Sequence, residues 1–284
     1  MCGKFLYCLC LILCGIGTEC AQAAEDECGQ AADECAAVGH WNFSVSLGAG
    51  VRTNPVRGGA AIPLIVIPHI SYYGKRFFID NVDAGFTLAD LGANTFSLIA
   101  TPGYDRVFFY RSDIQNIFVT GVSSVAGVPS NLAVVRPDTP GAVPFTSRAR
   151  HITYLAGPEW TFKSGIITGQ LDVLREITGY NQGFEVRAAI GAVIFHARGT
   201  LTANLGLTWK DSQIVEYYYG EINSYEPGSA LNPFLKLGYS LPLTGKWQLK
   251  AFAEYEKLAA SIANSPIVDR NRVITGFVGA NYAF

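Results

Sequence analysis

Apolar and polar residues alternate one by one along much of the chain after residue 40. In the segment TLTANLGLTW, one face carries only Thr, Asn and Gly, and the other carries Leu201, Ala203, Leu205, Leu207 and Trp209. The segments ITYLAGPEWTF, FEVRAAIGAVI and WQLKAFAEYE repeat this pattern. A period of two is typical of β-strands, because successive side chains of a strand point to opposite faces. The pattern therefore predicts an all-β protein.

The same reading places about twelve strands along the chain, and many of them are about ten residues long. Their expected ranges are 41–51, 63–73, 76–88, 95–101, 106–111, 149–162, 166–175, 183–196, 200–209, 232–241, 247–259 and 272–284. The weakest is 106–111. Because bacterial barrels have an even number of strands, losing this one would leave about ten.

Aromatic residues recur at the ends of these segments, at Trp160, Phe162, Trp209, Trp247, Tyr255 and Tyr282. A soluble β-sandwich can also alternate, but its strands are shorter. A barrel in the bacterial outer membrane needs an apolar outer face, aromatic residues at the membrane interfaces and no unpaired edge. We therefore predict an antiparallel transmembrane β-barrel over residues 41–284.

The connections between the expected strands alternate between long and short. The long ones cover 52–62, 112–148, 176–182, 210–230 and 261–271, and the short ones include 74–75, 163–165 and 243–245. In outer-membrane barrels the short turns face the periplasm and the long loops face outward. We expect both termini of the barrel in the periplasm, and we expect polar outer loops such as 217–229 to tolerate change.

Residues 1–23 have the features of a secretory signal peptide. Lys4 precedes an apolar stretch over residues 5–16, and Ala21-Gln22-Ala23 provides a cleavage site. The alternative, a transmembrane anchor, needs about twenty apolar residues, more than this stretch has. We expect residues 24–40 to form a short periplasmic segment before the barrel.

All 7 cysteines lie at or before residue 35, and cleavage after Ala23 leaves only Cys28 and Cys35. An even pair in an exported chain predicts a disulfide bond rather than a metal site. The remainder of the chain has no cysteine, so it offers no cysteine nucleophile and no cysteine-ligated metal centre.

Composition and motifs argue against several other functions. Only 15% of the residues are charged, against about a quarter in ordinary soluble domains, and the net charge of -2 does not favour a nucleic-acid partner. No G-x-S-x-G, H-E-x-x-H or P-loop motif occurs. His151 shares the inward face with Thr153 and Glu159, so we expect it to form a hydrogen bond in the lumen. We predict neither an enzyme nor a cofactor.

The last segment, GFVGANYAF, ends on an aromatic residue. The apolar face of this expected strand carries Val278, Ala280, Tyr282 and Phe284. We predict that this face contacts outer-membrane lipid and that the barrel assembly machinery reads it as an assembly signal.

Charged residues are expected on the inward face of the strands. They are Glu159, Asp172, Glu185, Arg187, Lys236, Lys250, Glu254 and Glu256. Their mixed sign favours a lumen filled by paired side chains. The alternative is a small diffusion channel. A pathway for cations, however, would require charges of one dominant sign along the lumen.

Four segments carry a resemblance to a known family. They are WNFSVSLGAGVRTNPVRGG, YYGKRFFIDNVDAGFTL, YYYGEINS and NSPIVDRNRVITGFVGANYAF, and they resemble the MltA-interacting protein family, also called MipA/OmpV. The chain departs from the family where Pro55, Arg57 and Gly59 replace a Pro-x-Tyr-x-Gly pattern, and the insert 112–148 is less typical.

The resemblance implies an outer-membrane protein without catalysis of its own. It implies a scaffold that holds a lytic transglycosylase near a murein synthase, which is a penicillin-binding protein. Members of the family are also linked to surface adhesion and stress responses, which remain alternatives to the scaffold.

Overall fold

The structure, a computed structural model, describes residues 38–110, 150–196 and 198–284. The expected signal peptide, the cysteines Cys28 and Cys35 and the insert 112–148 lie outside the described residues. The disulfide and the cleavage site therefore stay predictions.

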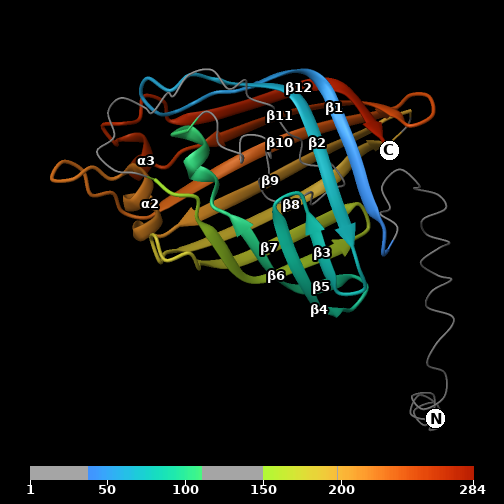
Figure 1. The fold of residues 1–284 in the computed structure, drawn as a ribbon, viewed down its shortest axis with the longest axis horizontal. Helices are drawn as coiled ribbons and strands as arrows, with labels where there is room; N and C mark the ends of the chain where they lie inside the picture. The colour runs from blue at the N-terminus through green and yellow to red at the C-terminus, as the bar shows by residue number, and fades with distance from the viewer. Residues whose placement is uncertain (1–37, 111–149, 197) are drawn as a thin grey trace, which may run out of the picture. The chain divides into compact units, whose positions relative to one another are not determined.

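Twelve strands form one closed antiparallel barrel in which each strand pairs with its neighbours in sequence and β12 pairs with β1 (Figure 1). Their bounds are β1 Trp41–Arg52, β2 Ile62–Tyr73, β3 Phe77–Asp80, β4 Asp83–Asp90, β5 Asn94–Pro102, β6 Tyr154–Ser164, β7 Ile167–Glu176, β8 Phe184–His196, β9 Thr200–Lys210, β10 Ala230–Pro242, β11 Trp247–Lys257 and β12 Arg272–Ala283. The predicted antiparallel barrel is confirmed.

Burial follows the alternation in the sequence. On β9, Leu205 is 57% exposed, whereas Asn204 is only 7% exposed and Thr202 is fully buried. The exposed face is apolar because lipid surrounds a membrane barrel, and the buried polar face lines the interior. The wall thus has the opposite polarity to a soluble barrel, whose core is apolar.

Two of the expected strands are wrong, although the total is right. The range 76–88 is a hairpin of β3 and β4 rather than one strand. The chain reverses at Asn81, whose φ of 55° is a left-handed conformation that Asn tolerates better than most residues. In the range 106–111, residues 106–108 belong to a 3-10 helix, η1 Tyr104–Phe108, rather than to a strand, and β6 begins at Tyr154 rather than at residue 149.

The side chain of Asn81 also ends the ladder between β2 and β3. The side-chain Oδ1 of Asn81 accepts a hydrogen bond from the Ile70 N–H at 3.1 Å, and the backbone N–H of Asn81 donates to the Ile70 carbonyl at 2.7 Å. Within the described ranges, β2 pairs with β3 at only three positions, which run from Ser71 to Tyr73. The barrel wall is therefore low at the β3–β4 hairpin.

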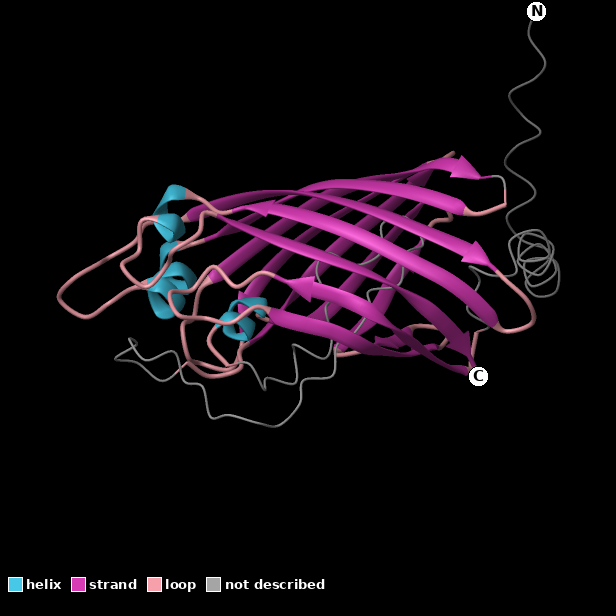
Figure 2. Ribbon diagram, turned by 90° about the horizontal axis from the view of Figure 1, so that it is seen from above, coloured by secondary structure: helices cyan, strands magenta, loops and turns pink. Residues whose placement is uncertain are grey.

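The two ends of the barrel differ (Figure 2). One end, which we call the outer end, carries the long connections and the helices η1, α2 Ser212–Tyr219 and α3 Ala260–Ala263. The other, the periplasmic end, carries short turns and the C-terminus. In the part of the chain that is described, no helix has the length and apolar character needed to cross a membrane.

Buried side chains pack together at the outer end in a cluster that we call the outer cap. It includes Val107, Phe109, Ile214, Tyr218, Tyr219, Ile262, Ile267 and Val268. Segment 217–229, which the sequence suggested to be a dispensable polar loop, therefore begins with buried aromatic residues. The YYYG and SPIV segments meet there, because Ser265 Oγ donates a hydrogen bond to the Tyr219 carbonyl at 2.6 Å.

Candidate functional site inside the barrel

A continuous row of polar residues crosses seven strands on the inner wall. Cross-strand pairing aligns Thr87, Ser97, Glu159, Asp172, Arg187, Thr208 and Asn232. The register creates this row, because neighbours that face each other across a ladder lie only about 5 Å apart. We call it the inner row, and it includes three of the charged residues expected in the lumen.

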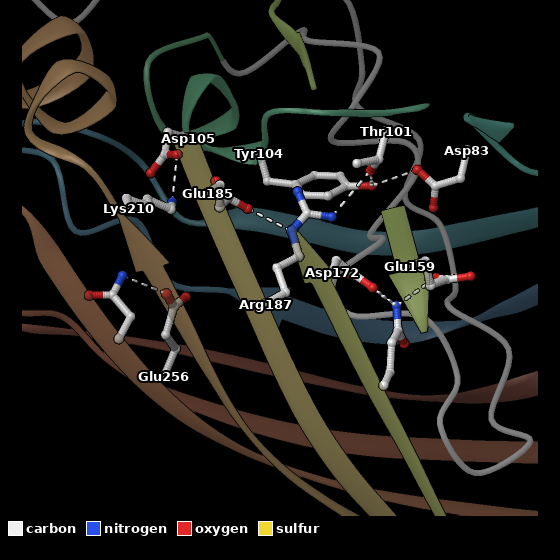
Figure 3. Close-up of polar contacts among 12 residues, drawn as sticks. Asp83, Thr101, Tyr104, Asp105, Glu159, Asp172, Glu185, Arg187, Lys210 and Glu256 are labelled. Carbon is white, nitrogen blue, oxygen red and sulfur yellow. Dashed lines mark hydrogen bonds and ion pairs between the residues drawn. The ribbon is translucent and has the colours of Figure 1, made fainter. Parts of the chain in front are cut away.

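Arg187, on β8, is the cation of the inner row, and it also contacts residues outside the row (Figure 3). Its Nε donates to Glu185 Oε1 at 2.6 Å and its Nη1 donates to Thr101 Oγ1 at 3.3 Å. The guanidinium lies 5.4 Å from the centre of the Tyr104 ring, and the Tyr104 hydroxyl donates to Asp83 at 3.3 Å. Arg187 Nη2 is buried and has no hydrogen-bond partner among the described residues.

Two carboxylates share one donor beside Arg187. Gln170 Nε2 lies 2.9 Å from Glu159 Oε2 and 3.0 Å from Asp172 Oδ1. Figure 3 shows Glu159 and Asp172 near each other. Asp172 is almost fully buried and Glu159 is half-buried. This amide holds two acidic groups close together on the wall formed by β6 and β7, and Arg187 supplies the nearest cross-strand positive charge.

A second ion pair joins the wall to the outer cap. Lys210 Nζ donates to Asp105 Oδ2 at 2.6 Å, and the Tyr219 hydroxyl donates to Asp105 Oδ1 at 2.8 Å. Lys210 ends β9, Asp105 lies in η1 and Tyr219 ends α2. One carboxylate of η1 therefore contacts two consecutive elements, β9 and α2, that lie more than 100 residues further along the chain.

The other expected lumen charges lie on β10 and β11. Lys236 Nζ is 4.0 Å from Glu254 Oε2, and Glu256 accepts a hydrogen bond from Asn232 Nδ2 at 2.9 Å. Lys250 is buried on the same inner face. These contacts are looser than the Arg187–Glu185 and Lys210–Asp105 pairs.

Several of these side chains line an open cavity below the outer cap. Its lining includes four cations and four anions, which are Arg52, Arg187, Lys210, Lys236, Asp105, Glu185, Glu254 and Glu256. Apolar and aromatic side chains such as Phe234 and Leu258 line it too. No cluster of three or more His, Cys, Asp or Glu suited to a metal is found in the described ranges.

The sequence did not single out Arg52, Asp83, Tyr104, Asp105 or Arg150. Arg52 directly follows the expected strand 41–51, so the alternation of that strand could have placed the Arg52 side chain in the lumen. Tyr104 and Asp105 directly precede the range 106–111, which the sequence predicted to be a strand, and only the fold brings them into the lumen. His151 is exposed and stacks on Tyr180 at 4.4 Å, so the expected lumen hydrogen bond of its side chain is wrong.

The residues expected to signal assembly lie at the periplasmic end of β12. Phe284 is 70% exposed, and its N–H donates to the Phe43 carbonyl of β1 at 2.9 Å. The Tyr282 ring contacts both Trp247 and Phe284. Val278 and Ala280 share the outward face with them. The last strand is therefore an apolar, lipid-facing surface beside the β1–β12 closure.

A closed antiparallel barrel with an apolar outside, a polar inside and long connections at one end defines an outer-membrane β-barrel protein. The family described as MltA-interacting protein MipA matches residues 45–284. The chain belongs to this family and is an outer-membrane protein.

Named relatives agree with this class. The chain is 24% identical over 255 residues to YiaT of Escherichia coli (strain K12), named as an outer membrane protein, with 85% of this chain and 91% of that protein covered. It is 23% identical over 260 residues to the MltA-interacting protein of the same organism, with 85% and 90% covered. Outer membrane protein OmpV of Vibrio cholerae is 29% identical over 129 residues, with 40% and 46% covered.

Comparison with solved structures found outer-membrane barrels. OmpT of Vibrio cholerae aligns with a TM-score of 0.36 and 10% sequence identity, covering 86% of this chain and 97% of that chain.

Proposed function

We propose that this barrel is a non-enzymatic anchor whose periplasmic end holds peptidoglycan-remodelling enzymes, a lytic transglycosylase and a penicillin-binding protein, at the outer membrane. The observation that carries the proposal is a set of exposed cations at the periplasmic end. These cations, which we call the basic rim, are Lys75, Arg76, Lys163, Arg198 and Lys246.

The basic rim lies in or beside four of the short turns. All five side chains are exposed, and none forms an ion pair within the described ranges. Exposed charges of one sign attract a partner of opposite sign and raise its rate of association. A periplasmic enzyme with an acidic surface would therefore be drawn to this end.

The kind of partner follows from a relative. One relative is named MltA-interacting protein, and it aligns with 85% of this chain. That name describes an interaction of the relative, and the family relationship supports a similar partner here. The Arg187–Glu185 and Lys210–Asp105 ion pairs and the packed outer cap support an anchor rather than a wide pore.

Crosslinking in intact cells tests the proposal. The variant in which all five rim cations become Gln should capture less lytic transglycosylase and penicillin-binding protein than wild type. A matched control replaces five exposed cations of the outer end by Gln, at Arg57, Arg175, Lys257, Arg270 and Arg272. The control should capture as much as wild type.

Two results would contradict the anchor. One is that wild type captures no peptidoglycan enzyme. The other is that the rim variant captures these enzymes as well as wild type but loses bound anionic phospholipid, which would assign the basic rim to lipid headgroups.

A small diffusion channel is the second candidate, and the open cavity lined by charged residues inside the barrel favours it. The mixed charges of the inner wall predict small or absent conductance with weak ion preference in a planar bilayer. A large, steady and selective conductance would favour the channel instead.

A further inference from the structure

We propose that the cavity below the outer cap binds a small zwitterion that has an apolar side chain, such as an amino acid. Arg52 and Arg187 would bind its carboxylate, and Glu256 and Glu254 would bind its ammonium group. This binding site is independent of the anchoring role at the other end of the barrel.

The first support is the buried positive charge of Arg52, for which no carboxylate of the described residues lies within ion-pair distance. Arg52 is only 7% exposed and lines the cavity. Its one hydrogen bond among the described residues joins Nε to Thr275 Oγ1 at 3.4 Å, which is long. A buried guanidinium is costly unless an anion and hydrogen bonds compensate it, so Arg52 is suited to bind an incoming carboxylate.

The second support is the negative charge of Glu256, which likewise has no ion pair among the described residues. Glu256 lines the cavity, and its side chain accepts one hydrogen bond, from Asn232, but forms no ion pair within the described ranges. Glu254, two residues earlier on the same face of β11, meets Lys236 only at 4.0 Å. Both carboxylates therefore retain capacity to accept hydrogen bonds from an ammonium group.

The register places these opposite charges at a suitable separation. Arg52 pairs with Thr275 of β12, and Thr275 pairs with Glu254 of β11. Two strand spacings put the backbones of Arg52 and Glu254 roughly 10 Å apart. Their side chains both extend into the lumen, so a small molecule with two charges can contact both.

Arg187 adds a second donor for the carboxylate. Its Nη2 is buried without a partner among the described residues, while Nε and Nη1 bind Glu185 and Thr101. Guanidinium groups bind carboxylates through strong, charge-assisted hydrogen bonds. An anionic group in the cavity would therefore accept a hydrogen bond from Nη2, a donor without a partner in the described part of the chain.

The balance of charges selects a zwitterion over a simple ion. Four cations and four anions line the cavity. An anion would compensate Arg52 but would repel Glu254 and Glu256, and a cation would compensate the carboxylates but repel Arg52, whereas a zwitterion offers each side the opposite charge. The side chains of Phe108, Phe234, Leu258 and Val273 give the cavity an apolar part, which suits an apolar side chain on the ligand.

Calorimetric titration of the purified, refolded full chain tests the site. The probe is L-phenylalanine, compared with 3-phenylpropionate, which lacks the ammonium group, and phenethylamine, which lacks the carboxylate. We expect L-phenylalanine to bind about tenfold more tightly than either analogue, since each lost charged contact is worth at least this much. No binding of L-phenylalanine, or equal binding of an analogue, would overturn the proposal.

Two substitutions assign the roles. Arg52→Gln should remove the preference for L-phenylalanine over phenethylamine, and Glu256→Gln should remove the preference over 3-phenylpropionate. The matched control Arg57→Gln removes an exposed outer-end cation, paired with Asp269 outside the cavity, and should keep both preferences. Heat-modifiable gel mobility verifies that each variant is folded. Retention of both preferences in the two cavity variants would also overturn the site.

Discussion

The outer and periplasmic ends of the barrel are built on different principles. At the outer end, long connections fold back over the lumen, and residues such as Tyr218, Tyr219 and Ile262 are fully or almost fully buried. At the periplasmic end, short turns leave five cations exposed. The outer end thus has a buried core of its own, whereas the side chains of the basic rim at the periplasmic end are exposed to solvent. Loop length alone does not distinguish a flexible loop from a packed cap.

Arg150 illustrates how the outer cap is held together. Its Nε donates to the Tyr218 carbonyl at 2.7 Å, its Nη2 lies 3.4 Å from Glu221 Oε1, and its guanidinium lies 4.3 Å from the Phe109 ring centre. Burial lowers the pKa of the Arg150 guanidinium, and Glu221 acts in the opposite direction. Burial, with the nearby Asp105 carboxylate, raises the pKa of the Tyr219 hydroxyl well above its ordinary value, so the hydroxyl remains a donor.

The largest effect is expected from Arg150→Met. The change leaves the Tyr218 carbonyl and Glu221 without this donor in a buried site, which should lower the free energy of unfolding by about 3 kcal/mol. Urea unfolding of the refolded protein measures it. The matched change Arg57→Met breaks an exposed pair and should cost less than about 1 kcal/mol. Equal losses would show that the outer cap has no buried core.

Tyr219→Phe should have a smaller effect on the same end. It removes the hydroxyl that donates to the Asp105 carboxylate while keeping the ring, so the free energy of unfolding should fall by about 1.5 to 3 kcal/mol. Tyr225→Phe, which removes a hydroxyl bonded to the Ser261 carbonyl, is the control and should cost about 1 kcal/mol. A smaller loss for Tyr219→Phe than for this control would contradict the role of Asp105 as a connector.

At the periplasmic end, Phe284→Asp and deletion of Phe284 should lower the amount of folded barrel several-fold, because assembly loses its apolar terminal residue. Quantitative immunoblotting of outer-membrane fractions, with and without heating, measures the folded form. Phe284→Tyr keeps an aromatic end and should assemble nearly normally. Equal amounts of all four proteins would refute the assembly signal.

The smallest effect is expected at the basic rim. Replacing its five cations by Gln should change the free energy of unfolding by no more than about 0.5 kcal/mol per substitution, because exposed, unpaired charges contribute little to stability. Urea unfolding of the variant and of the matched outer-end control measures this. A loss as large as that of Arg150→Met would mean that the rim, too, is structural.

Much of the barrel could be predicted from local pattern. Alternation gave most strands within a few residues of their bounds, because lipid outside and polar groups inside impose a period of two on every strand. It failed at 76–88, where the turn at Asn81 has no glycine or proline to mark it. It failed again at 106–111, because a short apolar run fits a strand and a helix equally well.

The candidate sites were predictable only in part. Alternation placed Glu159, Asp172, Glu185 and Arg187 on the inward face, and the structure places their side chains in the interior. Which of them touch depends on register between strands, and no single segment encodes that. Asp105 lies in a connection without a repeating pattern. Arg150 lies in the first part of the expected strand 149–162, which the structure shows to precede β6, so the sequence singled out neither residue.

The sequence by itself determined that this chain forms a membrane barrel, since every strand must carry apolar residues toward the lipid and polar residues toward the interior. The tertiary structure decided which side chains contact one another at the ends of the barrel and in the lumen. Only barrel closure aligns Arg52 with Thr275 and Glu254, and only the packing of η1 and α2 brings Tyr219 to Asp105. Strand formation follows from a local period, whereas these contacts join residues up to 223 positions apart and exist only once the strands are in register.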